Sequence, residues 1–151
     1  MVIRVQNDSF DAGYELNKFT RLLSSSGAIV SFSGVVRDIP DGLSEMQIEH
    51  YPGMTERSLE EICNEACSRW ELEDVLVIHR FGNLKKGEVI MMVITASPHR
   101  SAAFEAGEFL MDYLKSRAPF WKKEIGLDGS TWVDAIDKDE QALDRWVKEQ
   151  D

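Results

Sequence analysis

The residues best suited to chemistry in this sequence are Lys115, Arg117, Lys122 and Lys123, four cations within the ten residues 115–124 of an otherwise acidic chain. Crowded ammonium groups lower one another's pKa, so one lysine here could act as a neutral nucleophile or proton carrier. The same cations could hold a phosphate or a carboxylate. Because the dipole at a helix C-terminus also favours cations that have no function, both interpretations stay open.

A second candidate site is the segment 97–100, Ser-Pro-His-Arg. We expect Ser97 as the N-cap and Pro98 as the first residue of a helix, whose free backbone N–H groups could bind an anion. Arg100 would then be the third helical residue, where a cation opposes the helix dipole by roughly 0.3–1 kcal/mol. This mild cost indicates an anionic ligand. The alternative is an arginine that extends into solvent beside a locally packed His99.

Arg37 is a third candidate, because it ends an expected strand and precedes the loop 38–42, Asp-Ile-Pro-Asp-Gly. An arginine in such a place can clamp a phosphate with two hydrogen bonds. Taken alone, it is more often a solvated charge.

The spacing of these candidates bears on assembly. Arg100 and Lys115 are expected on one helix, where a rise of ~1.5 Å per residue places them roughly 22 Å apart. One small ligand cannot bridge that distance within a subunit. If both serve one site, we predict a two-fold dimer in which one subunit supplies the start of the helix and the other supplies the lysines.

Composition limits the partners and the location of the chain. Its 151 residues suit one sizeable core. The formal net charge of −10 argues against a general nucleic-acid binder or a binder of anionic membranes. Residues 1–8 lack the pattern of a signal peptide, and no apolar run approaches the roughly 18 residues of a membrane span. We expect a cytoplasmic protein.

Metal and thiol chemistry find little support in the sequence. Cys63 and Cys67 lie four residues apart in an expected helix, with no second Cys or His pair at metal-ligand spacing. We interpret them as two reduced core thiols, and we expect neither a metal nor a cofactor. His50 and His79 each stand alone in a strand-like run, and neither receives a site role.

The elements that must position the candidate residues follow from hydrophobic periodicity and from turn residues. The almost uninterrupted apolar run within 88–96 predicts a strand covered on both faces. Thr55 is expected to cap a helix, and Asp128-Gly129 indicates a final hairpin. With no repeat or linker, the prediction is a single α+β domain over residues 1–151. Strands are expected at 2–5, 28–37, 46–51, 75–81, 88–96, 120–125 and 131–136, and helices near 14–23, 55–70, 98–116 and 141–148.

Several longer blocks, in a fixed order between about Gly27 and Trp146, resemble the large subunit of molybdopterin synthase. The first two dozen residues and the loop 39–45 match this family weakly. The matching blocks are GAIVSFSGVVR at 27–37, HYPGM at 50–54, HRFG at 79–82, SPHR at 97–100, FLMDYLK at 109–115 and FWKKE at 120–124.

The resemblance implies an α/β hammerhead fold with a mainly antiparallel sheet and packed helices. It implies a homodimer of large subunits with a small ubiquitin-like subunit at each outer end, making a heterotetramer. The Gly-Gly tail of the small subunit, which carries a C-terminal thiocarboxylate, would enter a pocket of the large subunit. Sulfur would pass from it to cyclic pyranopterin monophosphate, and two sulfurs would complete the dithiolene of molybdopterin.

By position, the resemblance implies roles for individual residues. Lys115 matches the catalytic lysine and Lys122 a second essential lysine. Phe32 and Met111 match residues near the tail channel, although a strand Phe and a helix Met are core residues by default. Some members carry a lysine where this chain has Val35, which puts a side-chain role there in doubt. Residues matching substrate-binding or pocket positions are Arg37, His99, Arg100, Lys123 and Glu124.

Two other functions remain as alternatives. A non-catalytic scaffold could bind a ubiquitin-like tail or a phosphorylated metabolite without transferring sulfur. Thiol chemistry by Cys63 and Cys67 is the weaker alternative, because their helix also supplies a stripe of core residues.

Overall fold

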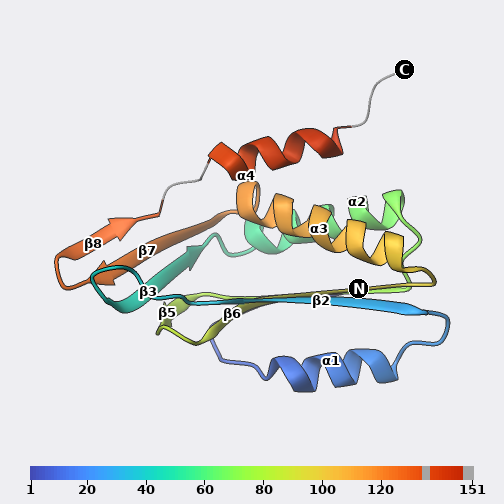
Figure 1. Ribbon diagram of the computed structural model, residues 1–151, viewed down its shortest axis with the longest axis horizontal. Coiled ribbons are helices and arrows are strands. Elements are labelled where there is room, and N and C mark those ends of the chain that lie inside the picture. The colour runs from blue at the N-terminus through green and yellow to red at the C-terminus, as the bar shows by residue number, and fades with distance from the viewer. Residues whose placement is uncertain (134–136, 148–151) are drawn as a thin grey trace.

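The computed structural model describes residues 1–133 and 137–147, which form two four-stranded sheets and four α-helices (Figure 1). One sheet has the order β1-β4-β6-β2 and the other β5-β3-β7-β8. Only the β1–β4 pair is parallel among these strands, which confirms the predicted α+β fold with mainly antiparallel pairing. The strands are β1 (Val2–Gln6), β2 (Ala28–Val35), β3 (Leu43–His50), β4 (Asp74–Arg80), β5 (Gly82–Leu84), β6 (Val89–Ser97), β7 (Phe120–Gly126) and β8 (Gly129–Trp132).

The first sheet is covered on both faces. Helix α1 (Ala12–Arg21) lies on one face, and α2 (Met54–Arg69) and α3 (Arg100–Ser116) lie on the other (Figure 1). Because side chains alternate along a strand, Leu76 and Ile78 pack with Phe19 of α1, whereas Val77 packs in the larger cluster with α2 and α3. β6 lies between β4 and β2 and is buried from Ile90 to Ser97, as its apolar run predicted.

The start of α2 differs from the prediction. Gly53, not Thr55, is the N-cap, and its backbone N–H donates to the carboxylate of Glu56 at 2.6 Å. Thr55 lies inside the helix and is fully buried. Its hydroxyl accepts from Tyr51 N at 2.9 Å and donates to the carbonyl of Pro119 at 3.1 Å. Thr55 therefore ties the start of α2 to the segment that leads into β7.

The start of α3 also needs a correction. His99 is the N-cap, Arg100 is the first helical residue, and Ser97 is not a cap. Ser97 pairs with Ala28 as the last residue of β6, and its hydroxyl donates to the carbonyl of Glu71 at 2.8 Å. Pairing in the sheet therefore engages Ser97 before the helix begins. Arg100 still lies in the first turn, at the positive end of the helix dipole.

The remaining departures concern short or terminal elements. β5 was missed, because three residues give too little periodicity. The predicted 131–136 strand is seen only as far as Trp132, and 134–136 lie outside the described residues. The predicted 141–148 helix has other bounds: α4 spans Asp137–Ala142 and a 3-10 turn spans Leu143–Trp146, while Lys148 lies outside the described part. The indole of Trp146 holds that turn against α3 by donating to Asp112 at 2.6 Å.

Cys63 is buried as predicted, but Cys67 is exposed, so the interpretation as two core thiols was wrong for the second cysteine. No helix among the described residues is long and apolar enough to cross a membrane.

Candidate active site

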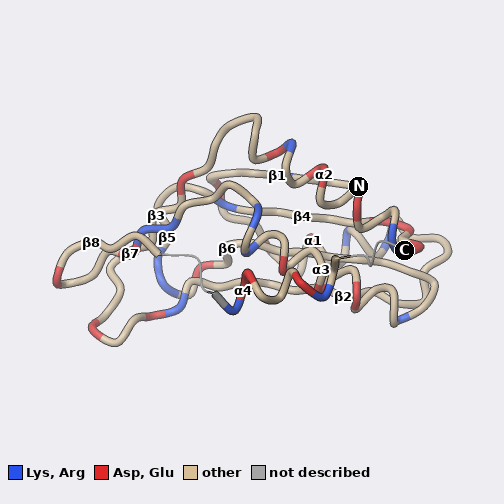
Figure 2. Tube along the Cα trace, turned by 90° about the horizontal axis from the view of Figure 1, so that it is seen from above, with Lys and Arg blue, Asp and Glu red and all other residues tan. Residues whose placement is uncertain are grey.

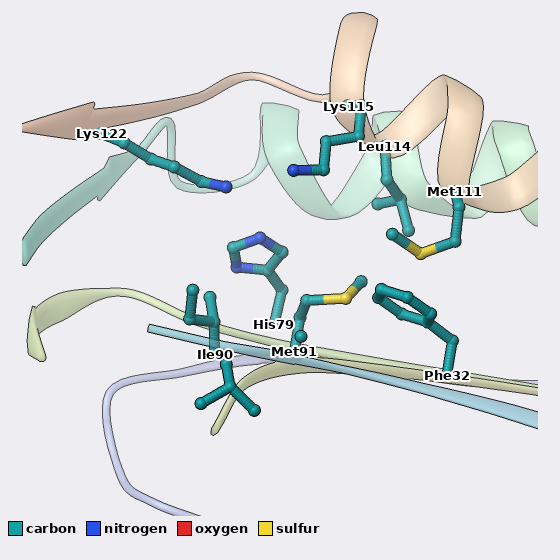
Figure 3. A pocket seen from close by; sticks show the side chains of 10 residues that line it. Phe32, His79, Ile90, Met91, Met111, Leu114, Lys115 and Lys122 are labelled. Carbon is teal, nitrogen blue, oxygen red and sulfur yellow. The ribbon is translucent and has the colours of Figure 1, made fainter. Parts of the chain in front are cut away.

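A pocket lies where the C-terminal half of α3 meets strands of both sheets (Figure 3). Its apolar walls come mainly from β2, β6 and α3, and its polar groups come from β4, α3 and β7. A neighbouring, larger cavity shares four of its residues, His79, Leu114, Lys115 and Lys122. The pocket is lined by Phe32, Gly34, Val35, His79, Ile90, Met91, Met111, Leu114, Lys115 and Lys122.

The structure brings together the two lysines that the sequence singled out. Lys115 is exposed in the last turn of α3, and Lys122 is half-buried in β7. Their side chains enter the pocket from opposite sides, and their amino groups point toward each other (Figure 3). The chain can reverse between them because α3 ends at Ser116 and Pro119 is held by Thr55.

This arrangement changes the acidity of Lys122. Burial, and secondarily the positive charge of Lys115, lower the pKa of Lys122 to about 8, although Asp139 acts in the opposite direction. At pH 7 about one tenth of such an amine is neutral, against fewer than one in a thousand for an unperturbed lysine. The sequence predicted that crowding of cations would lower the pKa of a lysine here, but for Lys122 burial is the larger cause.

His79 belongs to the pocket, although the sequence analysis gave it no role. It is buried on β4, and its ring stacks on Phe120 with centroids 3.7 Å apart and an interplanar angle of 15°. Burial, and secondarily the charges of Lys122 and Lys115, lower the pKa of His79 to about 3. The sequence did contain a signal for His79. On the strand it lies on the same face as Val77 and opposite to Ile78, so an ionisable side chain points inward from an apolar strand.

Phe32 and Met111 form the apolar end of the pocket. Phe32 is 45% exposed on β2, so it is not a core residue. Met111 on α3 is half-buried against the main core cluster. Both also line an adjoining apolar groove, together with Phe104. The pocket can thus accept a narrow segment that passes apolar side chains and ends in an anion beside the lysines.

The three predicted phosphate ligands are not gathered in one place within the chain. Because β2 runs antiparallel to β6, Ala28 lies beside Ser97 and Val35 lies beside Val89. Exposed Arg37 therefore follows the end of β2 near the lysine pocket, whereas His99 and Arg100 lie at the opposite end of α3. Within one copy of the chain, Arg37 is therefore not brought together with His99 and Arg100.

Lys123 and Glu124 do not line the pocket. Lys123 alternates with Lys122 along β7 and so faces the other side of the strand, where its Nζ lies 5.4 Å from the ring centroid of Trp132. Glu124 pairs with Met46 and Thr131 in the second sheet. Adjacent residues of the 120–124 block thus have different surroundings.

The charges outside the pocket are mixed. Figure 2 shows acidic and basic residues interspersed along the molecule, so the two facing lysines are a local feature of an acidic protein. In the part of the chain that the structure describes, no group of three His, Cys, Asp or Glu side chains could hold a metal ion.

Comparison with known proteins identifies the family of this chain. The family model described as MoaE protein matches residues 5–117. A molybdopterin synthase catalytic subunit of Cereibacter sphaeroides is 56% identical over 146 residues, covering 97% of this chain and 100% of the relative. One from Rhizobium meliloti is 49% identical over 150 residues, covering 98% and 97%.

A solved structure gives the same result. The molybdopterin biosynthesis MoaE protein from Burkholderia ambifaria superposes with a TM-score of 0.82 at 47% identity, covering 99% of this chain and all of that one. Because the family model spans well over half of the residues, and these relatives match nearly the full length, the chain belongs to the MoaE protein family.

Proposed function

We propose that this chain is the catalytic subunit of a molybdopterin synthase, an enzyme of molybdenum cofactor biosynthesis. It transfers sulfur from the C-terminal thiocarboxylate of a small ubiquitin-like partner to cyclic pyranopterin monophosphate (precursor Z). Two such transfers complete the dithiolene of molybdopterin. The relatives from Cereibacter sphaeroides and Rhizobium meliloti carry the name of this enzyme, which supports the assignment.

The observation that carries the proposal is the meeting of Lys115 and Lys122 at the polar end of an apolar-walled pocket. Two ammonium groups can neutralise a thiocarboxylate and the charge that develops as its carbon–sulfur bond breaks. An amine whose pKa is about 8 can also give up or accept a proton near neutral pH. Lys115 and Lys122 are the proposed catalytic residues, and Phe32 and Met111 flank the partner's tail.

The substrate phosphate requires further cations, and we assign them across two copies of the chain. Arg37 follows the strand that lines the lysine pocket, whereas His99 and Arg100 are separated from Lys115 by the length of α3. A second copy related by a two-fold axis supplies His99 and Arg100 to the first copy's lysines. In this proposal the dimer forms the centre of a heterotetramer with two small subunits, located in the cytoplasm.

Lys123 and Glu124, in the same 120–124 block as Lys122, lie farther from the proposed reaction. Lys123 and Glu124 remain predicted substrate-binding residues, and their position outside the pocket lining means that they act only from its rim or in the assembly. The domain is proposed to comprise the whole chain, residues 1–151.

The function is tested by mixing the chain with thiocarboxylated partner and the pterin, and following sulfur incorporation by mass spectrometry. We expect Lys115→Ala to lower the rate by on the order of 100-fold or more, because it removes a group needed at the reacting atoms. The melting temperature should change little, since Lys115 is exposed. The tail should still bind, through Lys122 and the apolar end of the pocket.

The matched control is Lys18→Ala, on helix α1 across the first sheet, which should keep the wild-type rate. Wild-type protein that binds the tail and transfers no sulfur would favour the scaffold alternative. Normal turnover by Lys115→Ala would contradict the assigned site.

A further inference from the structure

The buried imidazole of His79 has a defined proton arrangement. Its Nδ1 lies 2.8 Å from the backbone carbonyl oxygen of Arg80. A carbonyl oxygen can only accept a hydrogen bond, so Nδ1 carries the proton and the lone pair of the neutral ring is on Nε2. Stacking against Phe120 fixes the plane of the ring. His79 therefore presents an acceptor in one set direction.

That acceptor faces the two lysines. In Figure 3 the ring nitrogen farther from the His79 backbone points into the gap between the amino groups of Lys115 and Lys122. Among the described residues no group makes a hydrogen bond to Nε2, so this acceptor is available, and the ring lines both cavities that contain these lysines. Both lysines lower the pKa of His79, and Lys122 has the larger effect of the two.

The charges around the ring explain why a neutral acceptor suits this place. His79 faces Lys115 from α3, Lys122 from β7 and His50 from β3, while Asp139 of α4 acts on Lys122. A carboxylate here would raise the pKa of Lys122 and keep that amine charged. A positively charged side chain in the place of His79 would repel both lysines. A neutral imidazole can orient the amine and raises its pKa less than a carboxylate would, because the buried ring itself stays uncharged.

We propose that His79 is a positioning residue for the sulfur transfer, whose Nε2 accepts a hydrogen bond from the amino group of Lys122 and directs it toward the end of the bound tail. This inference rests on the proposed function. It extends that function by a residue that acts through Lys122 and does not itself exchange protons with the substrate.

Two variants separate this role from a merely structural one. His79→Phe keeps a ring against Phe120 and removes the acceptor, whereas His79→Gln places an amide oxygen close to the position of Nε2. We expect His79→Phe to lower turnover by about tenfold or more, the effect of one hydrogen bond to a charged group, with unchanged affinity for the tail. His79→Gln should stay within about threefold of wild type, because it restores the acceptor.

A second measurement does not depend on turnover. In NMR spectra of protein with 15N-labelled lysine, the hydrogen-bonded amino protons of Lys122 should exchange slowly in wild type and His79→Gln, and fast in His79→Phe. If His79→Phe does not fold, His79→Leu takes its place.

The outcomes distinguish the two claims. Equal losses in the Phe and Gln variants, or a fast-exchanging Lys122 amine in wild type, would overturn the role of His79. A slow Lys122 signal in a wild-type protein that transfers no sulfur would leave the hydrogen bond in place and refute the proposed function.

Discussion

At the scale of single residues, the pocket derives its chemistry from keeping positive charge partly out of water. Lys122 is the clearest case, because burial and Lys115 both favour its neutral form. Burying a cation lowers the stability of the fold, and it also makes a neutral amine available for proton transfer near neutral pH. The proposed function of Lys122 and the stability of the fold are therefore opposed at this residue.

This opposition predicts the behaviour of Lys122→Met. In the folded state the pKa is about 8 against an ordinary value of 10.5, so between these two values the unfolded chain binds more protons and stability rises with pH. Below pH 8 the cost is present in full. We expect Lys122→Met to raise the free energy of unfolding by on the order of 1–3 kcal/mol below pH 8, and to abolish sulfur transfer. The gain in stability should vanish by about pH 10.5.

Denaturant titrations of both proteins at a series of pH values measure this difference. Wild-type turnover measured alongside should increase as pH rises through about 8, if the neutral amine is the active form. A variant less stable than wild type at pH 7 would contradict the physical account of the site.

At the scale of elements, the connection between α1 and β2 depends on one carboxylate. Glu73, just before β4, accepts the backbone N–H groups of Ser24 at 2.7 Å and Ser25 at 2.8 Å, and the hydroxyl of Ser26 at 2.8 Å. These hydrogen bonds, led by that from the Ser24 backbone, lower the pKa of Glu73 to about 2. The carboxylate thus holds the segment that feeds edge strand β2, one wall of the pocket.

Glu73→Gln should therefore lower stability with a defined pH dependence. The folded pKa is depressed, so the contribution of the carboxylate is present above about pH 4.5 and is lost as pH falls toward about 2. We expect a lower melting temperature than wild type at pH 7, and convergence of the two proteins in that acidic range. Glu60→Gln, at an exposed position of α2, is the control and should be neutral. A difference in melting temperature that stays constant at all pH values would show that the charge of Glu73 does not cause the loss of stability.

At the scale of the whole molecule, the proposed site needs two copies of the chain. Helix α3 runs unbroken from Arg100 to Ser116, so the proposed substrate-binding end and the lysine end lie roughly 22 Å apart in each copy. Sedimentation should find a dimer at working concentration, and a monomer alone would refute the shared site.

A mixing experiment tests the sharing directly. Lys115→Ala and Arg100→Ala, each inactive alone, should recover about a quarter of the wild-type rate when exchanged at equal amounts. Half of the dimers are then mixed, and each of these has one intact site of two. Lys115→Ala mixed with Lys122→Ala is the matched control and should stay inactive, because both residues belong to the same copy of the pocket. Recovery in the control, or none in the test pair, would contradict the arrangement.

The sequence by itself determined the α+β class and most of the elements, and it singled out Lys115 and Lys122 as candidate residues. These depend on local properties, namely the period of apolar residues and the crowding of cations in a short segment. The same properties failed where tertiary pairing dominates. Ser97 looked like a helix cap but is the last paired residue of β6, and Thr55 is buried between two elements.

Only the tertiary structure decided which candidates share a pocket. It brought in His79, turned Lys123 away and separated Arg37 from His99 and Arg100. The physical reason is that strand register and the alternation of side chains determine these placements, and both depend on partners distant in the chain. The pKa of Lys122 likewise follows from burial, which no stretch of local sequence specifies.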